Sequence, residues 1–490
     1  MFKFWSALAW STELHGTGES SIHAATIDIL PDDIFREIFA SCLPDPYAYG
    51  DPIERMRLWQ RLVHVCQRWR QIIYASPYYL DLHIYCSNRT PFSKDLSCWP
   101  EFPLAVRYFI PREGRNLIAA LKHPDRVRRI DLIITNSEVE EVFAVMQVPF
   151  PMLTHLELMG ADDEDDVPDL PCRFLGGSAP CLQHLRLDSI SFPELPTLLL
   201  SARDLVSLQL NCIPPTGYIS PEAMVVGLAV LTRLRTLCIR FPSPIPPHEQ
   251  REMRPDPPML TVLPALTQFK FRGNSEYLED LVAQIDTPRV EDVRIEYFMQ
   301  EVQTHQLSQF IGRSANLKLA QFKRAQVTFH FYQAYVELDL PRGECHQAYL
   351  SLTVLPVDPG LNSLVPSMVN VLGQLDAMLS NVDHLSVHQN QVEQEILESV
   401  AWLPLFRPFS AVEVLRVSGG LVQYIASALE LEDTVLLPAL QLLLFDDDDD
   451  NNEYKPVGST KQFLSLRQLS GRPVTIVNSQ DEFVEAHQRH

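Results

Sequence analysis

The chain has 490 residues, of which 46% are hydrophobic, and carries a formal net charge of −22 from 40 basic and 62 acidic residues. That composition is typical of a globular protein, and the negative charge argues against general binding to nucleic acid or to an anionic membrane. The 9 cysteines form no C-x-x-C pair or zinc-type spacing, so we expect reduced thiols, no metal and no cofactor. No apolar run is long enough for a membrane helix, and we expect the protein in the cytoplasm, the nucleus or both.

Residues 1–26 are polar and predict a loose segment, and residues 27–85 predict a small helical domain. Its first helix begins at Leu30-Pro31, because proline suits the first helical position and the two acids that follow favour the helix N-terminus. The helix has one broad apolar face, formed by Ile34, Phe35, Ile38, Phe39 and Cys42.

A polar insertion at 44–51 precedes a second helical run. This run begins near Asp51-Pro52, carries apolar residues that include Val65 and Trp69, and ends at Ser76-Pro77. So small a unit cannot bury all this apolar surface internally, which indicates a partner-binding groove. The arginines of the run are either contacts to an acidic partner or its solvated face: Arg55, Arg57, Arg61, Arg68 and Arg70.

Leu30-Pro31-Asp32-Asp33-Ile34, Ile38-Phe39 and the stretch 62–70 (LVHVCQRWR) resemble the F-box motif. The chain departs from that motif in the insertion and at Asp81, where the family often has tryptophan. The resemblance implies docking onto a Skp-type adaptor and, through it, a cullin–RING ubiquitin ligase. The residues it assigns to adaptor binding are Leu30, Pro31, Ile34, Phe35, Ile38, Phe39, Val65 and Trp69.

We interpret residues 86–125 as a connecting segment and residues 126–475 as a repeat domain, with a tail at 476–490. An apolar triplet, L-x-x-L-x-L, recurs in the repeat domain every 20–30 residues, often with proline two places before it. The copies start at residues 127, 153, 182, 205, 234, 266, 290, 317, 382, 412 and 440.

This period is typical of leucine-rich repeats, in which each unit supplies one short strand to a parallel sheet. The fold class is therefore α/β, with an all-helical F-box head and an irregular leucine-rich-repeat-like solenoid. The copy at Leu317/Ala320/Phe322 is weak, and a degraded copy is expected around residues 349–352. Side chains between the paired apolar residues should line one exposed sheet face, such as Glu157, Arg186, Gln209 and Lys270.

Segments 263–298 and 404–428 resemble a large group of F-box proteins from mushroom-forming fungi. Together with the F-box, the resemblance covers most of the chain. It implies an adaptor-binding head and a repeat arm that holds a substrate, and it names no substrate.

No phosphate loop, G-x-S-x-G or H-E-x-x-H motif occurs, so we expect no catalytic residue and no enzyme activity. His384 and His388 favour surface histidines over half a metal site, and Cys172 and Cys181 favour buried thiols. The acidic runs at 162–166 and 446–450 favour solvated loops, with a basic peptide or weak calcium binding as alternatives.

These observations predict the substrate-recognition subunit of a Skp–cullin–F-box ubiquitin ligase. Its partners would be the Skp-type adaptor and an unknown protein target. The alternative is a repeat-based protein-binding module or scaffold that acts outside any ligase.

Overall fold

The structure is a computed structural model of the whole chain. It divides into two compact units, Met1–His83 and Ile84–His490. The predicted segment 1–26, the insertion 44–51 and the acidic run 162–166 lie outside the residues that the structure describes. Those residues are 29–43, 52–86, 102–108, 115–134, 136–161, 168–244, 260–298, 305–320, 322–339, 348–355, 361–389, 402–418, 421, 425, 436–446, 461–469 and 471–477.

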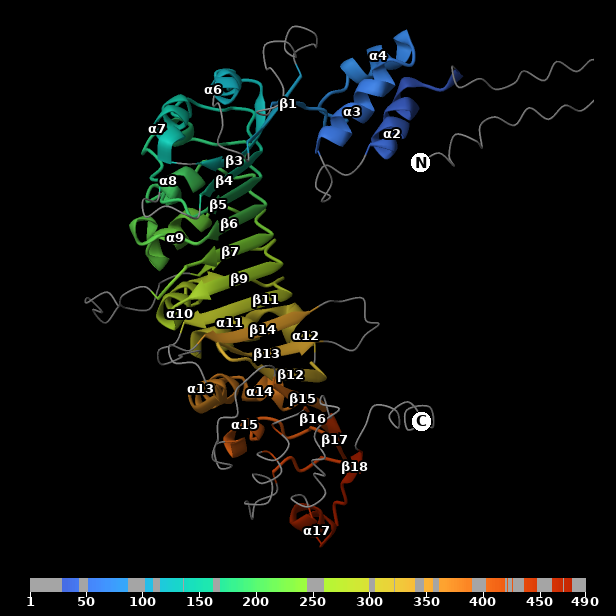
Figure 1. Cartoon of the computed structure of the whole chain (residues 1–490), viewed down its shortest axis with the longest axis vertical. Coiled ribbons are helices and arrows are strands. Elements are labelled where there is room, and N and C mark those ends of the chain that lie inside the picture. The colour runs from blue at the N-terminus through green and yellow to red at the C-terminus, as the bar shows by residue number, and fades with distance from the viewer. Residues whose placement is uncertain are drawn as a thin grey trace, which may run out of the picture. The chain divides into compact units, whose positions relative to one another are not determined.

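The described part of the first unit holds three helices (Figure 1): α2 (Asp32–Cys42), α3 (Pro52–Val63) and α4 (Gln67–Tyr74). The second predicted run, from Asp51-Pro52 to Ser76-Pro77, divides into α3 and α4, because the chain leaves the helix at residues 64–66. Cys66 is extended there and caps α4, its Sγ accepting a hydrogen bond from the backbone N–H of Trp69 at 3.4 Å. Pro31 is the N-cap of α2 and not its first helical residue, so the helix begins one residue later than expected, at Asp32.

The second unit is built on one sheet of 16 strands among the described residues, with helices alongside it (Figure 1). The sheet order is β1-β2-β3-β4-β5-β6-β7-β9-β11-β14-β13-β12-β15-β16-β17-β18. The strands are β1 (Ile84–Cys86), β2 (Leu104–Tyr108), β3 (Val127–Ile134), β4 (His155–Gly160), β5 (His184–Asp188), β6 (Ser207–Asn211), β7 (Thr236–Arg240), β9 (Gln268–Gly273), β11 (Asp292–Phe298), β12 (Arg324–Phe329), β13 (Ala334–Asp339), β14 (Tyr349–Leu355), β15 (His384–Gln389), β16 (Val414–Ser418), β17 (Leu442–Asp446) and β18 (Thr475–Val477).

Short helices return the chain from one strand to the next, and β8 (Thr261–Val262) pairs separately with β10 (Ile285–Asp286). Ser220 and Pro221 show how a return helix starts: the Ser220 hydroxyl accepts from the Ala223 N–H at 3.3 Å, and proline takes the first helical position. The helices are α6 (Arg115–Leu121), α7 (Asn136–Val145), α8 (Leu195–Leu199), α9 (Pro221–Leu228), α10 (Ser275–Val282), α11 (His305–Arg313), α12 (Ala315–Leu319), α13 (Leu361–Gln374), α14 (Asp376–Leu379), α15 (Leu403–Phe406) and α17 (Lys461–Leu469), with 3-10 turns at Phe174–Gly177 and Pro215–Gly217.

Most triplets form strands as predicted, and their paired apolar residues point into one continuous core. Leu156 and Leu158 of β4 are buried, and they register with Leu185 and Leu187 of β5. The chain is therefore an α/β protein with a long, mainly parallel sheet, which is consistent with a leucine-rich-repeat-like fold.

The sheet departs from the predicted repeat between β11 and β15. The copy at Leu317 is wrong: Leu317 lies in α12, whose N-terminus Ser314 caps with its hydroxyl. Apolar spacing of three suits a helix as well as a repeat, which explains the error. The copy around residues 349–352 is confirmed as β14, parallel to β11.

In the sheet, the antiparallel hairpin of β12 and β13 lies between β14 and β15. The prediction of an all-parallel sheet is therefore wrong at this place. The sheet also begins before residue 126. Strands β1 and β2 lie in or next to the expected connecting segment, and their short buried runs carry no triplet. At the other end β18 reaches Val477, two residues beyond the expected boundary.

Candidate functional site

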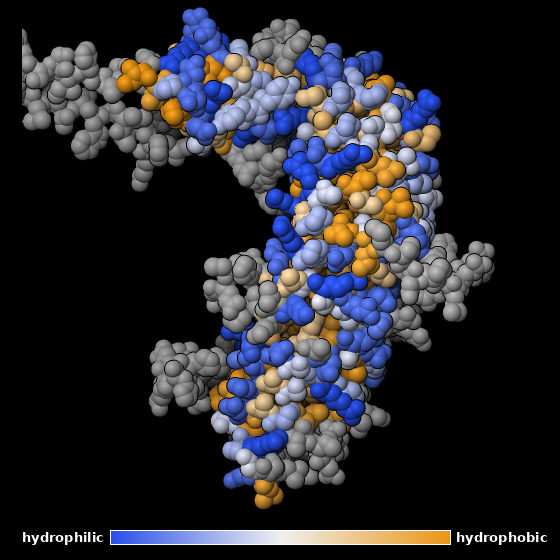
Figure 2. Space-filling view, turned by 180° about the vertical axis from the view of Figure 1, so that it is seen from behind, coloured by the Kyte–Doolittle hydropathy of each residue, from blue (hydrophilic) through white to orange (hydrophobic). Residues whose placement is uncertain are grey.

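The residues that the motif assigns to adaptor binding fall into two groups by burial. Ile34, Ile38 and Val65 are exposed, at 42%, 37% and 56%. Pro31 is exposed as well, and Leu30 is half-buried. Figure 2 shows hydrophobic side chains among hydrophilic ones on the surface of this unit. Ile34 and Ile38 lie one helical turn apart and share a face of α2.

The three aromatic residues of the motif form the core of the unit. Phe35, Phe39 and Trp69 are 0%, 1% and 7% exposed, respectively. The Trp69 ring meets Phe39 edge-on at 4.9 Å between centroids and Phe35 at 5.9 Å, so it fixes α4 against α2. These residues hold the helices in place, so their role in the described structure is in the core of the unit.

An arginine clamp fixes the beginning of α2. The Arg68 guanidinium donates to the Leu30 carbonyl at 2.6 Å and to the Asp32 carboxylate at 2.7 Å. Its Cζ also lies 4.9 Å from the centroid of the Phe35 ring. Because Arg68 donates to the backbone carbonyl of Leu30, this hydrogen bond does not depend on the side chains of Leu30 and Pro31.

Two other arginines of this unit are structural as well. Arg55 is buried and donates to the Leu80 carbonyl at 2.7 Å, and Arg70 donates to the Val63 carbonyl at 3.0 Å. The sequence left open whether the five arginines contact an acidic partner or form a solvated face, and three of them, Arg55, Arg68 and Arg70, bond to the unit itself.

The second unit presents a polar face on its sheet, opposite the apolar core. Glu157, Arg186, Gln209 and Lys270 are each half-buried and lie in one register row, with Cys238 between the last two. Their predicted placement on one face is confirmed. A long, partly exposed face of this kind is typical of solenoid proteins that bind other proteins.

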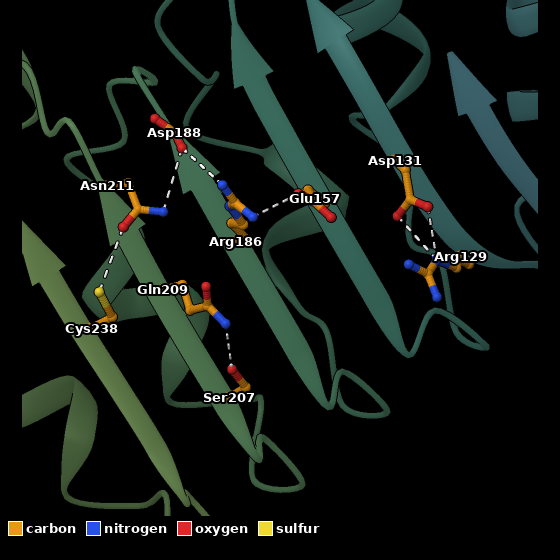
Figure 3. A network of polar contacts seen from close by, with 9 residues as sticks. All are labelled: Arg129, Asp131, Glu157, Arg186, Asp188, Ser207, Gln209, Asn211 and Cys238. Carbon is orange, nitrogen blue, oxygen red and sulfur yellow. Dashed lines mark hydrogen bonds and ion pairs between the residues drawn. The ribbon is translucent and has the colours of Figure 1, made fainter. Parts of the chain in front are cut away.

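Ion pairs join neighbouring strands on this face (Figure 3). Arg186 lies 3.2 Å from both Glu157 and Asp188, and Asp188 also accepts from Asn211 at 3.4 Å. Burial raises the pKa of the Glu157 carboxyl, although Arg186 opposes the shift. These ion pairs and hydrogen bonds hold the polar side chains of the face in fixed positions.

A pair of stacked histidines extends the same face on β4 and β5. The rings of His155 and His184 are 4.3 Å apart and 15° from coplanar. Burial, with help from the Arg129 charge, lowers the pKa of His184. The lowered pKa favours the neutral form of His184, and one face of its ring is covered by the ring of His155.

The remaining sequence candidates do not form sites in the described part of the chain. His384 and His388 lie on β15, with His384 bonded to Asp383 at 2.7 Å. The expectation of buried thiols is wrong, because Cys172 is exposed and Cys181 half-buried. Of the second acidic run, only Asp446 falls within the described residues, as the last residue of β17.

Two further kinds of feature, a membrane-spanning helix and a metal-binding cluster, are absent from the described residues. None of their helices has the length and apolar character to span a membrane. No group of three or more histidine, cysteine, aspartate or glutamate residues among them is arranged to hold a metal ion.

Comparisons with known proteins add little. No family model matches the chain, and no curated protein matches it significantly. Among solved structures, one similar chain is the leucine-rich repeat-containing protein LegL7 from Legionella pneumophila. The two chains are 12% identical, and the alignment covers 74% of this chain and 97% of the other. The TM-score is 0.26. A likeness this weak carries no argument about this chain.

Sequence reasoning missed most of the cations on the sheet face. It named Arg186 and Lys270, whereas Arg240, Arg272 and Arg294 also lie on this face, on β7, β9 and β11. Each follows a buried residue of its strand, and aligning the triplets to their last apolar residue would have revealed Arg240 and Arg272 in one register row.

Proposed function

We propose that this chain is the substrate-recognition subunit of a Skp–cullin–F-box ubiquitin ligase. The observation that carries the proposal is the exposure of Ile34, Ile38 and Val65 beside a closed aromatic core. A small helical unit that has already buried its aromatic residues gains nothing from aliphatic side chains in water. The same side chains fit the apolar centre of a protein interface.

The proposal gives the two units different tasks. The helical unit docks on a Skp-type adaptor, and the polar sheet face of the second unit holds a protein target. The chain would supply no reacting group of its own. It would raise the rate of ubiquitin transfer by keeping the target close to the ubiquitin-loaded enzyme of the ligase.

The experiment is a pull-down of a purified Skp-type adaptor by the full chain. The double substitution Leu30→Ala with Pro31→Ala should abolish capture, because it removes partly exposed side chains while the Arg68 clamp to the Leu30 carbonyl remains. The matched control is Val226→Ala, which trims an exposed valine on the second unit. Equal capture by wild type and the double variant would reject the motif assignment.

The same pull-down separates the ligase from a scaffold that acts without one. When the adaptor is supplied together with a cullin, the proposal expects the cullin in the captured complex. Adaptor without cullin would instead favour a protein-binding module that works outside ubiquitin transfer.

A further inference from the structure

Four cations form a block on three neighbouring strands of the sheet face. On β9, Lys270 and Arg272 lie two residues apart and therefore point to the same side. In register, Arg272 is beside Arg240 of β7, and Lys270 is beside Arg294 of β11. Strands are about 4.8 Å apart, so like charges are direct neighbours in both rows. We call these four residues the cation block.

The carboxylates near the cation block only partly neutralise it. Glu296 lies 2.6 Å from Arg240 and 3.7 Å from Arg272, and Asp292 lies 2.9 Å from Arg294. No carboxylate of the described residues is within ion-pair distance of Lys270. The charge of Glu337 also acts on Arg294, so four positive and three negative charges leave a net charge of +1 on this part of the surface.

This local excess stands out against the chain as a whole, whose formal net charge is −22. Like charges placed side by side in a sheet are destabilising, and neutral residues would serve the fold better. The guanidinium groups are also still available: Arg240 and Arg294 are 42% and 51% exposed at their side chains. An anionic ligand would reduce the repulsion between these cations. A surface that is only solvated does not require neighbouring cations of this kind.

We propose that the cation block binds a carboxylate-rich, extended segment of a partner protein. This rests on the proposed function, since it names the class of target for the sheet face. In an extended segment, alternate side chains point the same way and repeat about every 6.4–6.8 Å. That repeat matches the spacing of Lys270 and Arg272 on β9, so alternate acidic residues can meet both cations.

Glu296 competes with such a ligand from within the block. Its carboxylate occupies donors of both Arg240 and Arg272. An incoming acidic segment must share these guanidinium groups with Glu296 or displace it. Removing the Glu296 charge therefore strengthens binding, which a damaged fold could not do.

The test uses the full chain and a fluorescent peptide of alternating glutamate and serine, followed by fluorescence anisotropy. The variant Lys270→Gln/Arg294→Gln should weaken binding by about tenfold. The matched control, Arg203→Gln/Arg289→Gln, removes two exposed cations from the loops before β6 and β11 and should bind like wild type. Glu296→Gln should bind more tightly than wild type, and added salt should weaken all binding.

The inference is overturned if the two double variants bind the peptide equally, or if a lysine–serine peptide binds as well as the glutamate–serine one. A single-stranded oligonucleotide of equal charge that binds as tightly as the peptide also overturns it, since the block would then be a general anion site. Adaptor capture by the Lys270→Gln/Arg294→Gln variant should remain unchanged. A failure of this inference is thereby distinguished from a failure of the proposed function.

Discussion

Substituting Phe39 by alanine should unfold the helical unit while leaving the sheet intact. Phe39 is 1% exposed and packs its ring against Phe35 at 5.7 Å and Trp69 at 4.9 Å. An aromatic side chain buries about 150–250 Å², which at about 25 cal/mol per Å² corresponds to roughly 4–6 kcal/mol. Because alanine keeps part of this area, the expected loss is about 3–5 kcal/mol.

That loss is comparable to the whole stability of the unit. A domain of roughly 50 residues has a free energy of unfolding of about 2.5–7.5 kcal/mol. The matched control is Ile38→Ala, which changes the adjacent, 37% exposed residue and should lower stability far less. The pair of variants separates a residue that builds the core of the unit from an exposed residue on the same helix.

Hydrogen exchange followed by mass spectrometry measures both effects in one experiment. In Phe39→Ala, amides of α2 and α4 should exchange rapidly while amides of β4 to β9 keep wild-type protection. Ile38→Ala should preserve protection in all of them. Wild-type protection of α2 in Phe39→Ala would refute the assignment of the aromatic residues to the core.

Three further predictions concern the second unit. The folded-state pKa of His184 lies below its unfolded value of about 6.5, so its stabilising contribution is present above that pH and lost as pH falls; the melting temperature should drop more between about pH 7.5 and 5.5 in wild type than in His184→Gln. The Glu279 carboxylate accepts from the first backbone N–H groups of α11, so Glu279→Ala should cost about 2–3 kcal/mol in denaturant unfolding, and Glu279→Gln clearly less. Buried Arg467 donates to two backbone carbonyls that precede β17, so Arg467→Ala should speed amide exchange in α17 and β17, whereas unchanged exchange would assign it no structural role.

The sequence predicts the regular part of this fold well because the repeat rests on local spacing. Apolar residues two apart end up buried together on a strand, and this rule holds from β3 to β11. It fails at Leu317, where Ser314 provides an N-cap and the same spacing becomes a helix. The hairpin of β12 and β13 was missed because the weak copy was placed at Leu317, whereas β12 carries the same spacing five residues later, at the buried residues Phe322, Ala325 and Val327.

The sequence predicted the candidate site on the helical unit as one set of residues, without separating those in the core from those on the surface. The motif places Phe35 and Ile34 side by side in sequence, and only packing against α4 decides that the first is core and the second is surface. The cation block was missed for a related reason. Its paired charges are 32 residues apart in sequence for Arg240 and Arg272 and 24 for Lys270 and Arg294, and only the strand register brings them together.

The most direct test of the central claim is the affinity of the full chain for a purified Skp-type adaptor, measured by isothermal titration calorimetry. Interface anchors often contribute about 2 kcal/mol each, which is about thirtyfold in affinity. Ile34→Ala/Ile38→Ala should therefore weaken binding by at least thirtyfold, which is the effect of losing one anchor residue. Val226→Ala should leave the affinity unchanged. Undetectable binding by wild type, or equal affinities for wild type and the Ile34→Ala/Ile38→Ala variant, would contradict the account.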